Sequence, residues 1–506
     1  MKQEMSSDAD QTSRVMIVTS TLPLIHGGRT KSLLSRARMF RDHGVNVSIY
    51  TTNYNPNYQE VYDSFIRRGL VYPETKLNNI YDYYRNDKCE KTENNYQDYL
   101  NQQFPGWEQL PHFKKYEHSG VTYYYKAGSP LLHISRTVDG KIKNIDLYSP
   151  YFYSSYCRIY LDSQQNIHKI RYFESGNQAI VLRDVFLNNS LEEYLIKEFI
   201  DFAQKPAESR FILLQSEPRV FNTEKTFFAN WFNDLFCDGD IVINDARLLD
   251  APLLDTQKKM KKIFQLHSSH LANPADPASG IKGSYKLILA TKDPSSRIIT
   301  LSEKQKINIQ EKVPAMVDRL SVIPHFKQEY KLEFTVNPHK ICMISRLSIE
   351  KNLDECIRGM SLFHQLYPEY SLDIYGEGEQ WAHLNELIQE LHLEQVVHLR
   401  GYTEKPWEIY QKCAFSLITS NYEGFALSVL ESISNGCPVI SYQINWGPDE
   451  ILDEDSGRIT QQNTPEALCE AMVEEVRKPL DRTKTRERSK IFSKEVIWDK
   501  WCKLIF

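Results

Sequence analysis

Two glutamates flank a glycine turn in the stretch NYEGFALSVLE. Glu423 and Gly424 follow the apolar run FSLITS, and a helix is predicted from Ala426 to Ser434. Glu431 then lies in that helix, within about two turns of its start. Three interpretations of the pair are open: a general acid with its base, the two ends of a nucleotide clamp, or the polar ends of a surface helix.

The start of the predicted helix favours the clamp. The backbone N–H groups of Phe425, Ala426 and Leu427 would point at an anion, because the first N–H groups of a helix have no partner within it. One carboxylate would then reach sugar hydroxyls and the other a ribose, with phosphates between them.

Cations and glycines elsewhere could complete such a site. Arg346 and Lys351 in ISRLSIEKN directly follow a strand-like run, where two cations could neutralise a diphosphate; solvated surface charge is the alternative. Gly27 and Gly28 lie between a strand and a helix, where the missing Cβ would let a phosphate approach backbone N–H groups. A tight turn is the alternative for the two glycines.

Four further motifs carry weaker signals. YGEGEQ lacks the third glycine of a dinucleotide fingerprint. LHSSH places His267 and His270 after a strand, but without a third metal ligand nearby, so a hydrogen-bonding role is favoured over metal binding. The acidic motif Asp238–Asp240 precedes its strand and is not interpreted as a metal site. The basic runs KKMKK and 477–490 are interpreted as solvated faces, with an anionic acceptor or a membrane surface as the alternative.

The elements that must position these residues form two α/β series and an insert. The first series opens as strand, glycine loop, helix and strand over 15–51, and the second contains KICMISRL, SLDIYGEG, VVHLRGY, FSLITSNYEG and CPVISY. Residues from about 54 to 188 are tyrosine-rich and alternating, which indicates an antiparallel β-rich insert. Ligands of parallel sheets gather at the carboxyl ends of strands, where the candidate residues lie.

Length and composition limit the class of protein. The 506 residues predict two or three domains, and 41% hydrophobic with 25% charged residues is an ordinary globular balance. A net charge of −5 excludes a globally basic nucleic-acid binder. We find neither a membrane-spanning apolar run nor a secretory signal. Nine cysteines without a C-x-x-C pair predict reduced thiols and a cytoplasmic location.

Several of these motifs together resemble a known family. SRLSIEKN, YGEGE, GYTEKP and NYEGFALSVLESISNGCPVISY are similar to the retaining glycosyltransferase family 4, whose mark is a glutamate pair with the spacing seen here, 431 − 423 = 8. HGGRTKSLL, VYPETKLNNIYDYY and INWGPDEIL resemble its wall teichoic acid group, the poly(glycerol phosphate) α-glucosyltransferases and poly(ribitol phosphate) α-N-acetylglucosaminyltransferases. The resemblance covers nearly the whole chain.

The resemblance implies a GT-B fold, with two Rossmann-like doubly wound α/β domains facing a cleft and a β-rich insert in the first. The implied segments are 1–55 and 191–323 for the N-terminal domain, 56–190 for the insert, 324–490 for the nucleotide-sugar domain, and 491–506 for a helix that packs back on the N-terminal domain.

The resemblance also assigns roles to residues. Arg346 and Lys351 would hold the UDP diphosphate, Glu423 the sugar hydroxyls and Glu431 the ribose. The other implied site residues are Gly28 near the phosphates, Tyr402 near the uracil, His270 beside the transferring sugar, and the turn residues Gly424, Phe425, Ala426 and Leu427. Arg346, Lys351, Glu423 and His270 are the catalytic candidates, and the implied chemistry uses no metal and no cofactor.

The implied reaction transfers a hexose with retention from a UDP-sugar to hydroxyls of a polyanionic teichoic acid chain. Charge on the departing UDP would be stabilised by the two cations and the helix start. The sequence departs from the group at Phe425 and Ala426, and UDP-glucose is favoured over UDP-N-acetylglucosamine. The resemblance further implies a homo-oligomer, with a trimer favoured, formed through the insert, no nucleic-acid partner, and peripheral contact with the inner face of the plasma membrane as an option.

Two alternatives stay open. One is a cytoplasmic protein O-glycosyltransferase that modifies serine-rich or Ser-Asp-repeat adhesins. The other is an inactive scaffold or lectin-like partner built on the same fold. The four charged residues Arg346, Lys351, Glu423 and Glu431 are intact, which argues against an inactive protein.

Overall fold

The computed structural model describes residues 14–24, 27–85, 96–103, 105, 113–149, 151, 153–200 and 208–506. The chain divides into two compact units, each with its own internal contacts. The first unit comprises Met1–His26, Asn46–Asp240 and Leu248–Met260, and the second comprises Gly27–Val45, Ile241–Arg247 and Lys261–Phe506.

The first unit contains three parallel strands. They pair in the order β1 (Val15–Thr19), β2 (Val47–Thr51) and β3 (Lys76–Asn79). All five residues of β1 are buried, as expected for a strand of a parallel sheet that is covered on both faces. Helix α2 (Tyr58–Arg67) follows β2, and the short α3 (Ile80–Arg85) follows β3.

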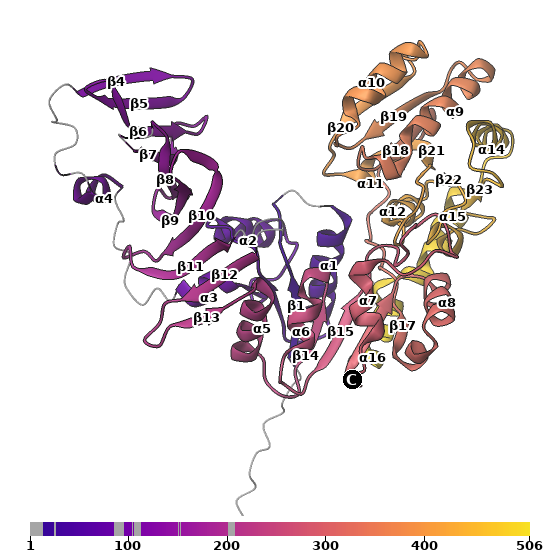
Figure 1. The fold of residues 1–506 in the computed structure, drawn as a ribbon. Helices are drawn as coiled ribbons and strands as arrows, with labels where there is room; N and C mark the ends of the chain where they lie inside the picture. The colour runs from indigo at the N-terminus through magenta and orange to yellow at the C-terminus, as the bar shows by residue number, and fades with distance from the viewer. Residues whose placement is uncertain are drawn as a thin grey trace, which may run out of the picture. The chain divides into compact units, whose positions relative to one another are not determined.

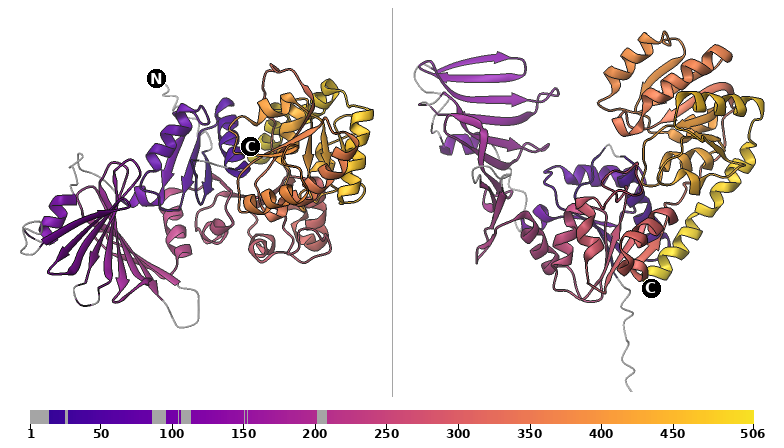
Figure 2. Two further views of the ribbon diagram at one scale, coloured as in Figure 1. Left: turned by 90° about the horizontal axis from the view of Figure 1, so that it is seen from above. Right: turned by 45° about the vertical axis from the view of Figure 1, so that its right-hand side comes forward.

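The insert is a ten-stranded antiparallel sheet in which neighbours in the chain are neighbours in the sheet. Its strands are β4 (Phe113–His118), β5 (Val121–Lys126), β6 (Ser129–Arg136), β7 (Ile142–Tyr148), β8 (Ser155–Leu161), β9 (Ile167–Glu174), β10 (Asn177–Leu187), β11 (Glu193–Ile200), β12 (Glu208–Leu213) and β13 (Arg219–Phe221). Figure 1 shows them in violet to magenta, and the views of Figure 2 show the sheet as a twisted fan.

Alternation explains why the insert forms an antiparallel sheet. Every second residue of β8 is buried, and Ile145 and Ile159 of adjacent strands pack with Leu100 of α4 (Tyr96–Gln103). The turns after Leu161 and after Arg136 join antiparallel strands. The sheet continues past residue 190, the predicted end of the insert, because β11 to β13 add to the same edge. The predicted domain boundaries stay a prediction.

The second unit opens with α1 (Gly28–Asp42) and contains a run of four parallel strands. These are β14 (Ile241–Asn244), β15 (Lys261–Gln265), β16 (Ser296–Thr300) and β17 (Leu320–Val322). Helices α7 (Gly283–Ala290) and α8 (Glu303–Lys312) lie between these strands in the chain.

The same unit holds a six-stranded parallel sheet in the order β20-β19-β18-β21-β22-β23. The strands are β18 (Asn337–Ile344), β19 (Ser371–Tyr375), β20 (Val397–Gly401), β21 (Cys413–Ile418), β22 (Val439–Ser441) and β23 (Gly457–Ile459). The chain leaves β18 towards β19 and later returns to its other side at β21. The crevice beyond the carboxyl ends of β18 and β21 is therefore a topological switch point, where such sheets bind ligands.

The helices of this sheet follow its strands. They are α9 (Leu353–Leu366), α10 (Trp381–Glu390), α11 (Pro406–Lys412), α12 (Leu427–Ser434), α13 (Pro448–Ile451), α14 (Pro465–Arg477) and α15 (Arg482–Arg488). Residues such as Ile357 of α9, Val429 of α12 and Leu468 of α14 share one core with the strands. Figure 1 shows these helices around the sheet in orange and yellow.

The C-terminal helix packs on α1. In α16 (Lys494–Ile505), Trp498 and Trp501 meet the ring of Phe40 edge-on at centroid distances of 5.9 and 5.3 Å. Lys261 Nζ donates to the carbonyl oxygen of Leu504 at 3.0 Å. The predicted C-terminal helix is confirmed, and its two tryptophans pack on α1.

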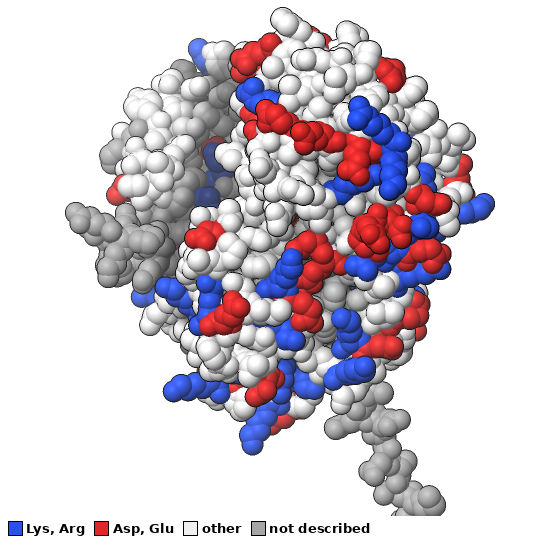
Figure 3. Space-filling model, turned by 90° about the vertical axis from the view of Figure 1, so that its right-hand side faces the viewer, with Lys and Arg blue, Asp and Glu red and all other residues white. Residues whose placement is uncertain are grey.

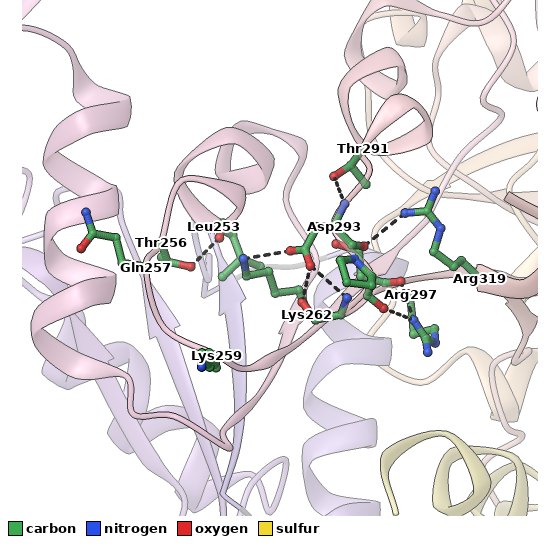
Figure 4. A network of polar contacts seen from close by, with 12 residues as sticks. Leu253, Thr256, Gln257, Lys259, Lys262, Thr291, Asp293, Arg297 and Arg319 are labelled. Atoms are coloured by element: carbon green, nitrogen blue, oxygen red, sulfur yellow. Dashed lines mark hydrogen bonds and ion pairs between the residues drawn. The ribbon is translucent and has the colours of Figure 1, made fainter. Parts of the chain in front are cut away.

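The basic runs are solvated faces only in part: Lys484 and Lys490 are 63% and 64% exposed, as predicted, whereas other members have internal partners. Lys262 of KKMKK is buried and its Nζ lies 3.0 Å from Asp293 Oδ2, in the polar network of Figure 4. In the run 477–490, Arg482 donates to the carbonyl oxygen of Cys413 at 2.8 Å, and Arg488 donates to that of Ile451 at 2.8 Å. Acidic and basic side chains lie interspersed on the face shown in Figure 3.

Candidate functional site

The switch point brings two of the predicted site residues together. Lys351, in the loop after β18, reaches Glu423, in the turn after β21, with Nζ 2.6 Å from Oε1. Both side chains are only 14% exposed, so the pair is largely withdrawn from water. Ser420 Oγ donates to the same carboxylate oxygen at 2.8 Å. The arrangement presents a cation and a carboxylate at fixed positions in the crevice.

Backbone and hydroxyl contacts hold the two loops against each other. Thr419 Oγ1 donates to the carbonyl oxygens of Lys351 and Asn352 at 3.2 and 3.0 Å, and Asn421 N donates to that of Glu350 at 2.9 Å. The Lys351 to Glu423 geometry is thus fixed by the main chain as well as by the side chains.

Gly424 makes the turn possible by its lack of a side chain. A Cβ at this position would overlap the carbonyl oxygen of His267, in the loop after β15. The turn therefore lies directly against the LHSSH segment, which the sequence analysis considered as a separate motif. Backbone approach of this kind is a frequent reason for glycine beside a ligand site.

The N-terminus of α12 follows the turn. Ala426 precedes it with φ 61° and ψ 64°, a left-handed conformation that costs energy for a non-glycine residue, and it supplies no side-chain cap. Phe425 is buried against His325 and Phe492, so only its backbone is available to a ligand. Leu427 is the first residue of the helix, one residue later than predicted.

The glycines of YGEGEQ have a structural role beside this site. A Cβ on Gly376 would overlap the carbonyl oxygen of Ser345, and one on Gly378 would overlap that of Leu347. Both φ angles are positive, at 151° and 159°. Leu347 N also donates to the carbonyl oxygen of Glu377 at 2.9 Å. The motif supports the loop that carries Arg346 and Lys351, which agrees with rejecting a dinucleotide fingerprint.

Arg346 differs from Lys351, although the same diphosphate-binding role is predicted for both. Its side chain is 70% exposed, and one guanidinium nitrogen lies 2.6 Å from Glu350 Oε1 in the same loop. The structure therefore places Arg346 on the outer side of the loop, whereas Lys351 faces the turn.

Glu431 has a partner that the sequence analysis missed. It forms an ion pair with Lys31, in the first turn of α1. Both residues line a cavity whose walls also include Leu427, His325, Gln328 and Trp501. Burial lowers the pKa of Lys31, but the charge and hydrogen bond of Glu431 outweigh it and raise that pKa above its usual value. Lys31 is therefore a fixed positive charge at neutral pH.

Two more predicted residues lie around this ion pair. Gly28 opens α1, and a Cβ there would press against Cδ1 of Leu427. Tyr402 follows β20, is 45% exposed and lies within electrostatic range of Lys31. Gly28, Tyr402, Leu427 and Glu431 thus gather around Lys31.

His270 is fully buried and poised as a hydrogen-bond acceptor. Its Nε2 lies 3.0 Å from Asn308 Oδ1, and Asn308 Nδ2 donates to the carbonyl oxygen of Pro277. Asn308 Oδ1 is therefore the acceptor, so Nε2 carries the proton and Nδ1 keeps its lone pair. Nδ1 has no partner among the described residues. The ring stacks on Trp446. The residue before Trp446 is Asn445, and its carbonyl oxygen accepts a hydrogen bond from Glu423 N.

The pH dependence of stability should report the neutral state of His270. Burial lowers its pKa to about 4, from about 6.5 in an unfolded chain. As the pH drops, the unfolded chain binds this proton at a higher pH than the folded protein does. The free energy of unfolding therefore falls between about pH 6.5 and pH 4. For this group the fall is at most about 1.4 kcal/mol per pH unit. In His270→Gln the fall should be less steep, as measured by urea denaturation at several pH values. An equal slope in both proteins would contradict the assignment.

A buried charge network supports the LHSSH loop, and the sequence analysis missed two of its members. His267 Nε2 lies 2.7 Å from Asp245 Oδ1, and Arg36 of α1 pairs with the other oxygen. Burial alone would raise the pKa of Asp245, but the Arg36 charge and the hydrogen bonds hold it well below its usual range. Asp245 directly follows the buried strand β14, and that position was the available signal in the sequence.

The acidic motif at 238–240 has structural partners. Arg14 reaches Asp240 Oδ2 at 2.7 Å, and Lys259 N donates to Asp238 Oδ1 at 2.8 Å. Over the part of the chain that the structure describes, no three His, Cys, Asp or Glu side chains gather as metal ligands would. Among these residues, no helix is long and apolar enough to cross a membrane.

Known proteins match the chain over most of its length. It is 25% identical over 486 residues to the poly(glycerol-phosphate) alpha-glucosyltransferase of Bacillus subtilis (strain 168), covering 90% of this chain and 69% of that protein. It is 22% identical over 515 residues to the poly(ribitol-phosphate) alpha-N-acetylglucosaminyltransferase of Staphylococcus aureus (strain COL), covering 97% and 99%. The crystal structure of TarM, from S. aureus, matches with a TM-score of 0.87 at 22% identity, over 98% of this chain and 99% of that one.

These matches confirm two predictions. The structural match confirms an α/β, GT-B-like fold with parallel sheets and an antiparallel insert. The two relatives bear the names of the two enzyme types that the sequence resembles. Residues 326–492, which contain Lys351, Glu423 and Glu431, match the family described as glycosyl transferases group 1. This chain therefore carries a glycosyl transferases group 1 domain within a GT-B-like fold.

Proposed function

We propose that this protein is a retaining glycosyltransferase that moves a hexose from a UDP-sugar to hydroxyls of a poly(polyol phosphate) chain. The proposal depends mainly on the ion pair of Lys351 and Glu423, which is largely shielded from water. This pair lies at the switch point of the region that matches glycosyl transferases group 1. Relatives named for glucosyl and N-acetylglucosaminyl transfer to such polymers support the acceptor class. Glucose is the favoured sugar.

Charge stabilisation is the proposed source of catalysis. Lys351 stabilises the negative charge that develops on the UDP phosphate as the sugar departs, and it acts from a largely water-excluded position where such a charge is most effective. Arg346 contributes after it leaves Glu350. The uncapped start of α12 adds backbone N–H donors. We infer attack from the same face as the departing phosphate, because the sequence offers no evident nucleophile.

Hydrogen bonds to hydroxyls orient the donor. Glu423 accepts from the hydroxyls of the transferring sugar, and Glu431 accepts from the ribose. His270 Nδ1, which is bare and buried, accepts from a further hydroxyl of the sugar. A neutral histidine fits this role, because its low pKa leaves Nδ1 unprotonated and able to accept a hydrogen bond at neutral pH.

The setting of the reaction is part of the proposal. We infer a cytoplasmic, metal-independent enzyme without cofactor that forms a homo-oligomer, with a trimer favoured, through the antiparallel insert. The acceptor chain is polyanionic, and contact with the inner face of the plasma membrane would bring the enzyme to a lipid-linked polymer.

A donor and acceptor matrix tests the function. UDP release from UDP-glucose and from UDP-N-acetylglucosamine is measured with the purified full-length protein. The acceptors are poly(glycerol phosphate), poly(ribitol phosphate) and a Ser-Asp-repeat peptide, each with and without EDTA. We expect the greatest stimulation for UDP-glucose with poly(glycerol phosphate), and no effect of EDTA.

Other results of the matrix would replace parts of the proposal. Stimulation by the peptide alone would identify a protein O-glycosyltransferase. Stimulation by poly(ribitol phosphate) with UDP-N-acetylglucosamine would reverse the substrate preference but keep the reaction class. Failure to bind any UDP-sugar would indicate an inactive partner protein.

A further inference from the structure

Each positive charge of the candidate site already has a carboxylate partner. Lys351 is paired with Glu423, Arg346 with Glu350, and Lys31 with Glu431. A diphosphate needs cations whose charge is not already neutralised. Binding of a nucleotide therefore requires some of these pairs to exchange partners.

The pair of Lys31 and Glu431 is best placed for such an exchange. Its side chains are 32% and 22% exposed, more than those of the Lys351 and Glu423 pair, and both line the cavity beside α12. The carboxylate is the one that the proposed function gives to the ribose. When ribose hydroxyls take Glu431, Lys31 loses the partner that neutralises it.

The position of Lys31 points to the phosphates as its next partner. Lys31 lies three residues after Gly28, and a Cβ on Gly28 would lie 2.9 Å from Cδ1 of Leu427, the first residue of the uncapped helix α12. That helix start carries partial positive charge and attracts phosphate. A lysine side chain is long and flexible enough to turn from Glu431 towards a group held there.

We propose that Lys31 is a donor-binding residue that is held by Glu431 in the unliganded protein and transfers to the diphosphate when the nucleotide binds. The inference rests on the proposed use of a UDP-sugar. Helix α1 would then contact the donor twice. Lys31 would supply a charged contact, and the backbone at Gly28 would supply the predicted contact to the phosphates.

A purely structural role makes a different prediction. If Lys31 only positions Glu431 for the ribose, its loss weakens every ligand that contains the ribose, with or without phosphates. If Lys31 binds the diphosphate, its loss weakens only ligands that carry the phosphates. Uridine, UMP and UDP separate these two cases because they share the nucleoside.

The test compares Lys31→Met with the wild-type full-length protein. Dissociation constants for uridine, UMP and UDP are measured by ligand-observed NMR titration, and folding is checked by thermal denaturation. We expect UDP to bind about 10- to 100-fold more weakly to Lys31→Met, as for loss of one charge-assisted hydrogen bond. Uridine should bind equally well or more tightly, because Glu431 is no longer engaged.

Two further variants complete the experiment. Lys31→Arg keeps the charge and should retain most of the UDP affinity. Lys304→Met removes a lysine that pairs with Asp449 on the surface, and it should leave all three dissociation constants unchanged.

Three results would overturn the inference. An equal loss for uridine and UDP in Lys31→Met would make Lys31 a positioning residue for Glu431. Unchanged UDP binding would remove Lys31 from the site. If the wild-type protein binds none of the three ligands, the proposed function fails, and this inference fails with it.

Discussion

Replacing Lys351 with methionine should lower the turnover number for sugar transfer by about 100- to 1,000-fold, the usual effect of removing one donor that stabilises transition-state charge. Lys351 Nζ lies 2.6 Å from Glu423, and both side chains are only 14% exposed, so its charge acts with little screening by water. The loss should fall on kcat more than on KM, because the phosphate gains charge as the sugar leaves.

The expected loss can be separated from unfolding. Ser420 and the main-chain contacts at Thr419 and Asn421 remain in Lys351→Met, so the turn should persist. Thermal denaturation checks this. A matched control is Lys340→Met. Lys340 lies in β18, the strand that precedes the Lys351 loop, and pairs with Asp373 of β19 at 2.9 Å. That variant should keep wild-type turnover.

Two outcomes would contradict the assignment of Lys351. Near-normal turnover by a folded Lys351→Met protein would place the catalytic cation elsewhere. An equal loss in Lys340→Met would show that the strand, and not the charge in the crevice, controls the rate. Glu423→Gln offers an independent check, since it removes the partner carboxylate while keeping the size of the side chain.

Replacing Gly424 with alanine should damage both stability and activity. The added Cβ would overlap the carbonyl oxygen of His267, which is held in place by the network of Asp245 and Arg36. Either the turn or the LHSSH loop must move. We expect the free energy of unfolding to fall by about 1 to 3 kcal/mol. A displacement of Glu423 by about 1 Å would lower turnover by about 100-fold.

The matched control for Gly424→Ala is Gly283→Ala. Gly283 opens α7, and no atom lies within 4 Å of the position that its Cβ would take. Alanine is the better helix former, so this variant should be as stable as the wild type or more so. Urea denaturation and UDP release measure the two effects. A Gly424→Ala protein with wild-type stability would mean that the turn does not contact the LHSSH loop.

Local patterns carried much of the site prediction. Glu423, Gly424 and the helix after them could be located because a buried strand, a glycine and a helical repeat follow one another within a short stretch of chain. The same holds for Lys351, which follows a buried strand. The alternating insert was recognisable for a similar reason. Its antiparallel pairing continues to Phe221, past the predicted bound at residue 190.

The tertiary structure decided which charges meet. Lys31 and Glu431 are 400 residues apart, and Arg36 and Asp245 are 209 apart, so no local pattern could join them. Arg346 and Lys351 looked equivalent in sequence, yet one is exposed and the other faces Glu423.

Local sequence patterns suffice to predict many of the strands and helices, the glycine turn and the family resemblance, because neighbouring residues specify these through periodicity and backbone conformation. The ion pairs, the His270 Nδ1 atom without a hydrogen-bond partner among the described residues and the close approach of Gly424 to His267 became visible only in the folded structure. Those depend on packing between segments that are distant in the sequence, and packing assigns each side chain its partner and its exposure to water.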